Sequence, residues 1–211
     1  MDKFFGLEGP LISFLDKCGR VVILSVLWVI CSLPLFTLGA SSTALYYSIT
    51  KTVRKERSSS VREFFKSFGR SFKRSIPFTI IFLVGMFVLY LDTAIWAGKK
   101  TKMAFVSMNV CIVLMLILVA FAGFVFPVIS RFILGFKDTA RFTAFLTFRH
   151  LPVSLALVVM AMILAIGTWS FFLNLVYLPG VLCLIASVMI ENVLKKYIPK
   201  PDEGEEVWYD E

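Results

Sequence analysis

Few side chains in this sequence are of a type and spacing that could do chemistry. The single histidine, His150, precedes Leu151 and Pro152 at the edge of an apolar run, where we expect an interfacial residue rather than a base or a ligand. The four cysteines are Cys18, Cys31, Cys111 and Cys183. They share no close spacing, and three of them lie within apolar runs, which is typical of buried thiols. Because the sequence contains no HExxH, CxxC, GxSxG or glycine-rich phosphate loop, we expect no catalytic residue, no metal site, no cofactor and no enzymatic activity.

Two acidic residues come close to apolar runs and are the remaining candidates for chemistry. A charge within hydrocarbon is costly, so an ionisable residue there is expected to have a function. Asp92 follows an apolar run and is expected at a membrane interface, close to Trp96 and Lys99. Glu191 ends the last apolar run. Both positions predict boundary residues, and no series of carboxylates within the apolar runs predicts a proton path.

The elements that position these residues are membrane helices. Residues 151–190 form a run of forty positions without Asp, Glu, Lys, Arg or His. A helix of that length would measure about 60 Å, twice the hydrocarbon thickness of a bilayer, so the run predicts two spans. Composition agrees, since 58% of residues are hydrophobic and only 17% are charged, against about 25% in soluble domains. The basic residues behind the net charge of +8 lie between apolar runs, which indicates membrane topology rather than nucleic-acid binding.

The apolar runs predict an all-α, polytopic bundle of about five transmembrane helices in a single membrane domain, residues 1–200, followed by an acidic cytoplasmic tail, residues 201–211. The expected spans lie near 21–48, 75–97, 103–130, 152–170 and 174–192, with a break around 167–174.

The first run, residues 21–50, allows two interpretations. We interpret it as one kinked helix, in which Thr37 or a neighbouring helix satisfies the backbone group that Pro34 frees. The alternative is a helical hairpin, which has fewer than the roughly 20 residues that each complete span needs. Five residues in or beside the spans are candidates for helix packing and bending: Pro34, Thr37, Gly39, Pro127 and Pro152.

The orientation follows from the basic loops. Residues 51–74 carry nine Lys and Arg, so the positive-inside rule places this segment in the cytoplasm. With one kinked first span the N-terminus lies outside and the C-terminus inside, which puts sixteen basic residues inside and six outside. With a hairpin the N-terminus also lies inside, and the count becomes nineteen to three. Span length favours the first arrangement, while charge counting slightly favours the second.

The two basic segments also predict amphipathic helices at the cytoplasmic surface. At residues 60–63 the sequence SVRE fits a capping box, with Ser60 as N-cap and Glu63 reaching back. A basic helix with a Phe-rich face lies flat on lipid or docks on a partner. The expected lipid or partner surface consists of Phe64, Phe65, Phe68 and Phe72 with Arg62, Lys66 and Arg70. A second such helix is expected at 138–150, with Phe142, Phe145 and Phe148 flanked by Arg141 and Arg149.

Several segments, spread over most of the chain, match the pattern of a known family. They are FFGLEGP at 4–10, SLPLFTLGA at 32–40, ALYY at 44–47, FFKSF at 64–68, FPVISRF at 126–132 and RHLP at 149–152. With these segments the sequence resembles the YesL family of bacterial integral membrane proteins, also described as domain of unknown function 624. Members are typically found beside sugar-uptake transporters and glycan-degrading enzymes in Gram-positive bacteria.

This resemblance implies a multi-pass protein of the bacterial cytoplasmic membrane with a role in carbohydrate transport. The first hypothesis is an accessory component that contacts subunits of a sugar ABC transporter. The alternative is an autonomous small-solute transporter or channel that acts as a homo-oligomer, for which aromatic side chains could contact a neutral sugar. The candidates for such contacts are Trp28, Trp96, Trp169 and Tyr177.

Overall fold

The computed structural model describes residues 10–54, 59–99 and 101–197. In that part of the chain all regular structure is helical, with seven α-helices and short connecting turns. Three helices, α4 (Ser60–Ala97), α5 (Lys102–Arg131) and α7 (Leu151–Ser170), are long and apolar enough to cross a bilayer, and α8 (Leu178–Leu194) is a shorter apolar helix. The predicted class of an all-helical, multi-pass membrane protein is therefore confirmed. The opening segment 4–10, apart from Pro10, and the acidic tail lie outside the described residues.

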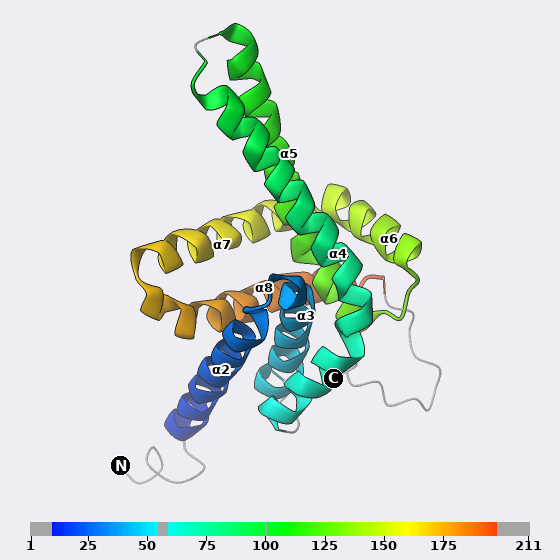
Figure 1. Ribbon diagram of the computed structural model, residues 1–211. Helices are drawn as coiled ribbons and strands as arrows, with labels where there is room; N and C mark the ends of the chain where they lie inside the picture. The colour runs from blue at the N-terminus through cyan, green and yellow to red at the C-terminus, as the bar shows by residue number, and fades with distance from the viewer. Residues whose placement is uncertain (1–9, 55–58, 100, 198–211) are drawn as a thin grey trace.

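The first apolar run does not form one kinked helix. Helix α2 (Pro10–Ser32) ends before Pro34, whose backbone is extended (φ −76°, ψ 109°), and α3 (Leu38–Ser48) follows a single 3-10 turn. Proline lacks the N–H that a continuing helix needs, and it disfavours helical backbone at the residue before it. The chain therefore reverses here, and the hairpin that the sequence left open is the observed structure (Figure 1).

Side-chain contacts along α2 and α3 establish that the two helices are antiparallel. The hydroxyls of Ser32 and Ser41 lie 2.6 Å apart near the turn. At the other end of the hairpin, Arg20 Nη1 lies 3.5 Å from the carbonyl oxygen of Thr52, in the π-helical turn Ile49–Arg54 that follows α3. The beginning of α2 and the basic segment after α3 therefore lie at the same end of the molecule. An arrangement with the beginning of α2 on the opposite side from this segment is not compatible with the hairpin.

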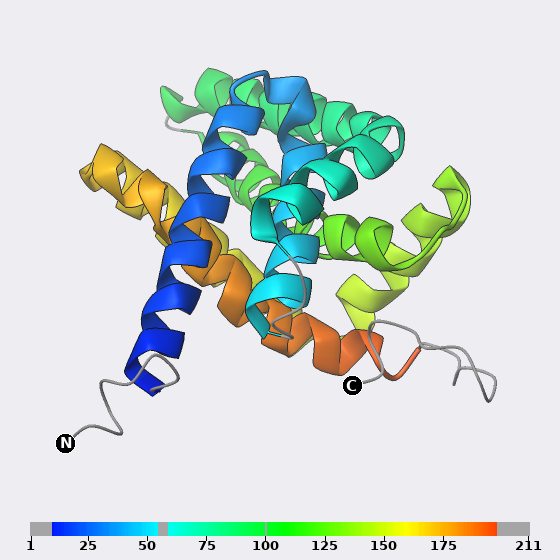
Figure 2. The same cartoon turned by 90° about the horizontal axis from the view of Figure 1, so that it is seen from below.

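Helix α4 joins two elements that the sequence separates. The expected surface helix and the span near 75–97 form one helix of 38 residues, which changes direction along its length (Figures 1 and 2). Pro77 lies inside it, and a proline within a helix removes a backbone hydrogen bond and causes such bends. The first half of α4 packs on α3 rather than lying free on a surface. Its buried face consists mainly of small polar residues and Phe64: Ser60, Glu63, Phe64, Ser67, Ser71 and Ser75.

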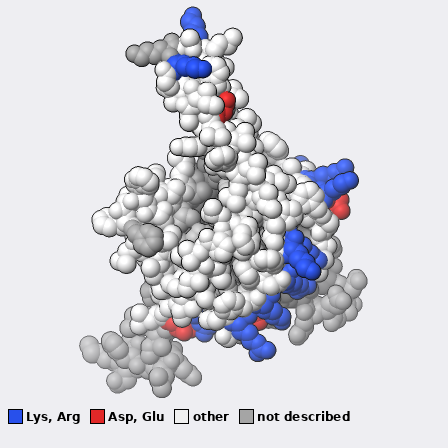
Figure 3. All heavy atoms as spheres, in the orientation of Figure 1, with Lys and Arg blue, Asp and Glu red and all other residues white. Residues whose placement is uncertain are grey.

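The apolar ends of α4 and α5 form a hairpin that projects from the rest of the molecule (Figure 1). Lys99 and Lys102 lie at its tip, and the surface between the tip and the body is almost free of charge on the face that Figure 3 shows. Exposed apolar side chains cover the projecting part on both helices, among them Val84, Val88, Ile95, Phe105 and Val110.

The second half of the chain contains one more surface helix and one more hairpin. Helix α6 (Phe136–Arg149) is separate, as expected for 138–150. Helices α7 and α8 form a hairpin, and the turn between them includes a 3-10 segment at Phe172–Val176. Of the expected spans, 103–130 and 152–170 coincide with α5 and α7, whereas the last helix starts four residues later than the expected 174.

Small residues allow the hairpins to approach one another closely. A Cβ built on Gly39 of α3 would overlap Thr79 Oγ1 of α4 and lie 2.6 Å from Phe126 Cε1 of α5. At the start of α8, a Cβ on Gly180 would lie 2.8 Å from the carbonyl oxygen of Val21 in α2. Such contacts are typical of helix packing in membranes, where glycine and serine let backbones approach.

Candidate functional site: a buried ion pair beside a basic pocket

Three polar side chains from three different helices meet inside the bundle. Arg131, the last residue of α5, donates from Nε to Glu191 Oε1 of α8 at 3.0 Å, and its Nη2 contacts the second carboxylate oxygen. The hydroxyl of Tyr46 in α3 donates to the same Oε1 at 2.8 Å. The side chains of Arg131 and Glu191 are only 1% and 3% exposed. This cluster, called here the Arg131–Glu191–Tyr46 triad, joins α3, α5 and α8.

Sequence reasoning placed Glu191 at a membrane boundary and did not identify its partners. Glu191 does lie in the last turns of α8, but it faces the interior rather than the interface. The available signal was that Arg131 and Glu191 each end an apolar run and have opposite charges. A separation of 60 residues along the chain gives no local pattern that pairs them, whereas an i, i+4 pair on one helix can be recognised directly.

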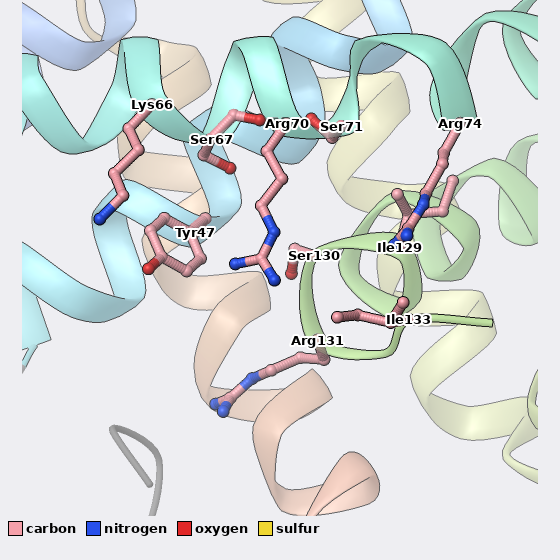
Figure 4. Close-up of a pocket in the computed structure, with 10 residues that line it drawn as sticks. All are labelled: Tyr47, Lys66, Ser67, Arg70, Ser71, Arg74, Ile129, Ser130, Arg131 and Ile133. Carbon is pink, nitrogen blue, oxygen red and sulfur yellow. Dashed lines mark hydrogen bonds between the residues drawn. The ribbon is translucent and has the colours of Figure 1, made fainter.

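A basic pocket opens next to the triad (Figure 4). Lys66, Arg70 and Arg74 follow one another at four-residue spacing on α4, so they lie on one face of the helix. The Arg70 side chain extends from α4 toward Arg131, with Tyr47 on one side and Ser130 on the other (Figure 4). The cavity has a volume of about 120 Å³. Its lining also includes Ser67, Ser71, Ile129 and Ile133.

The positive charge of this pocket is not balanced by acids on the described part of the chain. Glu63, one turn before Lys66, is paired with Lys51 at 3.0 Å, and Glu191 is paired with Arg131. Burial lowers the pKa of Lys51, but the hydrogen bonds to Glu63 and Tyr47 outweigh it, so that the pKa is raised from its ordinary value. Among the described residues, no acidic side chain lies within ion-pair distance of Lys66, Arg70 or Arg74.

A second, apolar cavity of about 370 Å³ lies among the helices on the other side of Tyr46. Its walls come from α2, α3, α4, α5, α7 and α8 and include Phe82, Phe126 and Leu157. Trp28 and Ser42 add polar groups, but the indole N–H of Trp28 donates to the Ser42 hydroxyl at 3.1 Å. The cavity is therefore lined mainly by apolar groups and suits an apolar ligand better than a sugar.

The other ionisable candidates are not part of the triad. Asp92 accepts hydrogen bonds from Ser107 Oγ at 3.2 Å and Cys111 Sγ at 2.9 Å, which link α4 to α5 within the projecting hairpin. His150, between α6 and α7, lies 3.1 Å from the hydroxyl of Tyr197 through Nε2. Within the described ranges, no group of three or more His, Cys, Asp and Glu side chains could hold a metal ion.

The predicted capping box at residues 60–63 is not formed. Helix α4 begins after Ser59 without a side-chain cap. The Ser60 hydroxyl donates to Thr52 Oγ1 at 3.0 Å, and Glu63 pairs with Lys51. Both side chains therefore join α4 to the turn after α3, and these tertiary contacts replace the local pattern.

The residues expected at a lipid or partner surface are divided between interior and exterior. Phe64 is fully buried, whereas Phe65, Arg62, Lys66 and Arg70 are exposed. Phe68 and Phe72 are half-buried, and their ring centroids lie 5.6 Å apart with the ring planes tilted by 57°. The face that the Phe spacing predicted is therefore turned partly into the contact with α2 and α3.

The packing candidates lie at bends and close contacts. Thr37 Oγ1 lies 2.5 Å from the carbonyl oxygen of Cys31 and 2.6 Å from that of Pro34. Its hydroxyl therefore links the turn between α2 and α3 to the end of α2. Pro127 is buried inside α5, and Pro152 occupies the first turn of α7.

The aromatic side chains proposed for sugar contacts are not brought together. Trp28 lines the apolar cavity, whereas Trp96 contacts Lys99 at the tip of the hairpin. Trp169 is 93% exposed at the end of α7. Tyr177 is exposed, and its hydroxyl donates to Asn174.

Comparison with known families identifies one domain in this chain. Residues 21–93 match the family model described as "Protein of unknown function, DUF624", so the chain carries a DUF624 domain over that range, from α2 into the apolar part of α4. This match confirms the resemblance seen at 32–47 and 64–68, while the segments at 4–10, 126–132 and 149–152 lie outside it. Neither the curated proteins nor the solved structures include a match to this chain.

Proposed function

We propose that this DUF624 protein is a non-catalytic accessory component of a carbohydrate uptake system in the bacterial cytoplasmic membrane. In this role it contacts transmembrane helices of a transporter permease subunit through the projecting α4–α5 hairpin. The proposal combines the surface of that hairpin with the setting that the family resemblance implies. Bacterial origin, carbohydrate uptake and the transporter partner rest on the resemblance alone.

The observation that carries the proposal is the polarity of the hairpin. Most of its exposed side chains are apolar, but Asn109 of α5 is also exposed, seven residues from the first residue of the helix. One side-chain N–H donates to the carbonyl of Phe105, and the amide has a second N–H and a carbonyl oxygen that can also form hydrogen bonds. Amide side chains in membrane helices typically hydrogen-bond to neighbouring helices. A protein partner, rather than lipid alone, satisfies such a group.

The proposed orientation places the beginning of α2, the basic segment 51–74, α6 and the end of α8 in the cytoplasm. Because the α2–α3 hairpin brings Arg20, in the middle of α2, next to Thr52, the preceding part of α2 lies at the same end as the basic segment, and the positive-inside rule applies to all of these elements together. Among the Lys and Arg of the described residues, only Lys99 and Lys102 fall at the outer tip of the hairpin. This arrangement replaces the expected external N-terminus and keeps the internal C-terminus.

The alternative, an autonomous transporter that acts as a homo-oligomer, has one observation in its favour. The 370 Å³ cavity is lined by six helices, and Tyr46 and Trp28 are among its lining residues. However, Tyr46 donates to Glu191 and Trp28 to Ser42. Their polar groups are already used within the chain, which supports a structural role for them and makes the accessory role the better proposal.

The test is purification of the tagged full-length chain from its native membrane in mild detergent, with quantitative mass spectrometry of sugar-transporter subunits. The test variant replaces two exposed hairpin residues, Val88→Ala with Ile95→Ala. The matched control replaces two equally exposed apolar residues on α7, Leu155→Ala with Ile166→Ala. Alanine keeps both surfaces apolar, so membrane insertion is preserved.

The wild type and the α7 variant are expected to recover permease subunits in fixed stoichiometry. The hairpin variant is expected to recover several-fold less, because the proposal places both residues near the centre of the interface, where the residues whose truncation costs more than about 1 kcal/mol are concentrated. Recovery of this chain alone as a defined oligomer, together with solute uptake by the pure protein in liposomes, would contradict the accessory role and favour the alternative.

A further inference from the structure

We propose that the basic pocket between α3, α4 and the end of α5 binds a phosphate group. The ligand class is a phosphate ester or inorganic phosphate. The proposal does not depend on the accessory role, because it rests on the lining of this pocket alone.

The positive charge of the basic pocket is not balanced by nearby acids on the described part of the chain. Lys66, Arg70 and Arg74 project from one face of α4 into or beside a single cavity (Figure 4). Glu63 forms an ion pair with Lys51, and Glu191 forms one with Arg131. Three like charges at four-residue spacing repel one another along a helix. An anion in the pocket relieves that repulsion and stabilises the arrangement.

The hydrogen-bond donors that the pocket offers are mainly charged side chains. The hydroxyls of Ser71 and Ser130 donate to backbone carbonyls, at 2.7 Å to Ser67 and 2.8 Å to Pro127. The strongest hydrogen-bond donors that the pocket offers a ligand are therefore the cationic side chains. Guanidinium groups present forked N–H pairs that match the oxygens of phosphate. Two arginines and a lysine around one cavity thus select an anion with several oxygens and more than one charge over a single carboxylate.

The size and the position of the cavity also suit a phosphate group. The cavity of about 120 Å³ is several times the roughly 10–15 Å³ that one water needs on the same measure, so a phosphate group fits. Ile129 and Ile133 form its apolar side, and the uncharged part of α4 begins at Ser75, directly after Arg74. The pocket therefore lies where polar and apolar surfaces meet. A phospholipid headgroup and a soluble phosphate compound both have access to that position.

The experiment uses the full-length chain and two double variants. Arg70→Gln with Arg74→Gln removes two pocket cations, and both side chains are exposed, so folding is preserved. Arg62→Gln with Arg141→Gln removes the same charge from exposed positions that do not line the pocket. Native mass spectrometry counts retained lipids after reconstitution in phosphatidylcholine with or without phosphatidylglycerol. In parallel, lipid-depleted protein in a neutral detergent is titrated with inorganic phosphate against chloride at equal ionic strength, and the thermal midpoint is followed.

The expected result is that wild type and control bind phosphatidylglycerol or inorganic phosphate. The pocket variant is expected to bind the same probe about tenfold more weakly or worse, since two charge-assisted contacts are lost. Selective loss of retained phosphatidylglycerol identifies a lipid headgroup as the source of the phosphate. Selective loss of the phosphate-induced rise in thermal midpoint identifies a soluble compound. If the pocket variant and the control lose both signals equally, the arginines act only as surface charge and the proposal is overturned. Absence of both signals in the wild type overturns it as well.

Discussion

Arg131 and Glu191 form an ion pair across 60 residues of chain, with both side chains almost fully removed from the surface. Arg131 ends α5 and Glu191 lies in the last turns of α8, so the pair fixes two hairpins relative to each other at one end of the bundle. The Tyr46 hydroxyl adds α3 to this connection. The triad also lies between the basic pocket, which Arg131 lines, and the apolar cavity, which Tyr46 lines.

Breaking this pair should strongly destabilise the protein. Glu191→Gln leaves the buried guanidinium without its counter-charge, a change that typically costs roughly 3–5 kcal/mol. The matched control is Asp16→Asn, which breaks the exposed pair with Arg20 at 2.8 Å and should cost at most about 1 kcal/mol. Thermal unfolding in detergent measures both. Equal midpoints for the two variants would show that the buried pair does not hold α5 to α8.

Gly39 should not tolerate even one added methyl group. Gly39→Ala places a Cβ against Thr79 and 2.6 Å from the ring of Phe126, and overpacking of this kind costs roughly 1–3 kcal/mol. Gly69→Ala is the control, because Gly69 is helical and nothing lies within 4 Å of its added Cβ. There, alanine should be neutral or stabilise α4 by up to about 1 kcal/mol. The expected order of thermal midpoints is therefore Gly69→Ala, wild type, Gly39→Ala, and any midpoint of Gly39→Ala at or above the wild type contradicts the close packing of α3.

The sequence allows some of these features to be predicted and hides others for physical reasons. Apolar runs without charges reveal α5 and α7, because burial in lipid demands an uninterrupted apolar helix. The length rule for complete spans predicts one helix at residues 21–50, and it fails there because α3 is not a complete span. Helix α3 has only 11 residues and buries its small and hydroxyl-bearing face against α4 instead of meeting lipid.

The candidate site is harder to predict because its groups come from separate helices. The Phe spacing of residues 64–72 predicted an external apolar face, but Ser67 and Ser71 form the inner one, since small residues permit close helix packing. Of the residues that line the basic pocket, the sequence predicted only Lys66 and Arg70, as part of a lipid or partner surface on one helix. The closure of the pocket by Arg131 depends on the packing of α5 against α4, which no local pattern contains.

The stability of the protein should decrease when the pH is lowered through the titration of His150. Burial lowers the pKa of His150 from its ordinary value of about 6.5, and the positive charges of Lys196 and Arg149 lower it further. Between the lowered pKa and about 6.5 the unfolded chain binds more protons than the folded one, so stability rises with pH in that window. We expect a lower thermal midpoint at pH 5.5 than at pH 7.5, with little further change above about pH 7.

His150→Gln isolates this effect, because His150 is the only histidine of the sequence and glutamine can still hydrogen-bond to Tyr197. The difference between the midpoints at pH 7.5 and 5.5 should shrink in this variant. The same difference in wild type and variant would assign the pH dependence to carboxylates instead.

The α2–α3 hairpin makes a direct prediction about membrane sidedness. In the proposed orientation Cys18, on the exposed part of α2, and position 59, before α4, are cytoplasmic, whereas Gly98 at the tip of the α4–α5 hairpin is outside. Three single-cysteine proteins test this: one that keeps Cys18, and two cysteine-free chains with Ser59→Cys or Gly98→Cys. A membrane-impermeant maleimide should label only Gly98→Cys in intact cells and all three after the cells are disrupted. Labelling of Cys18 together with Gly98→Cys in intact cells would place the beginning of α2 outside and contradict the hairpin, since Arg20 could not then reach Thr52.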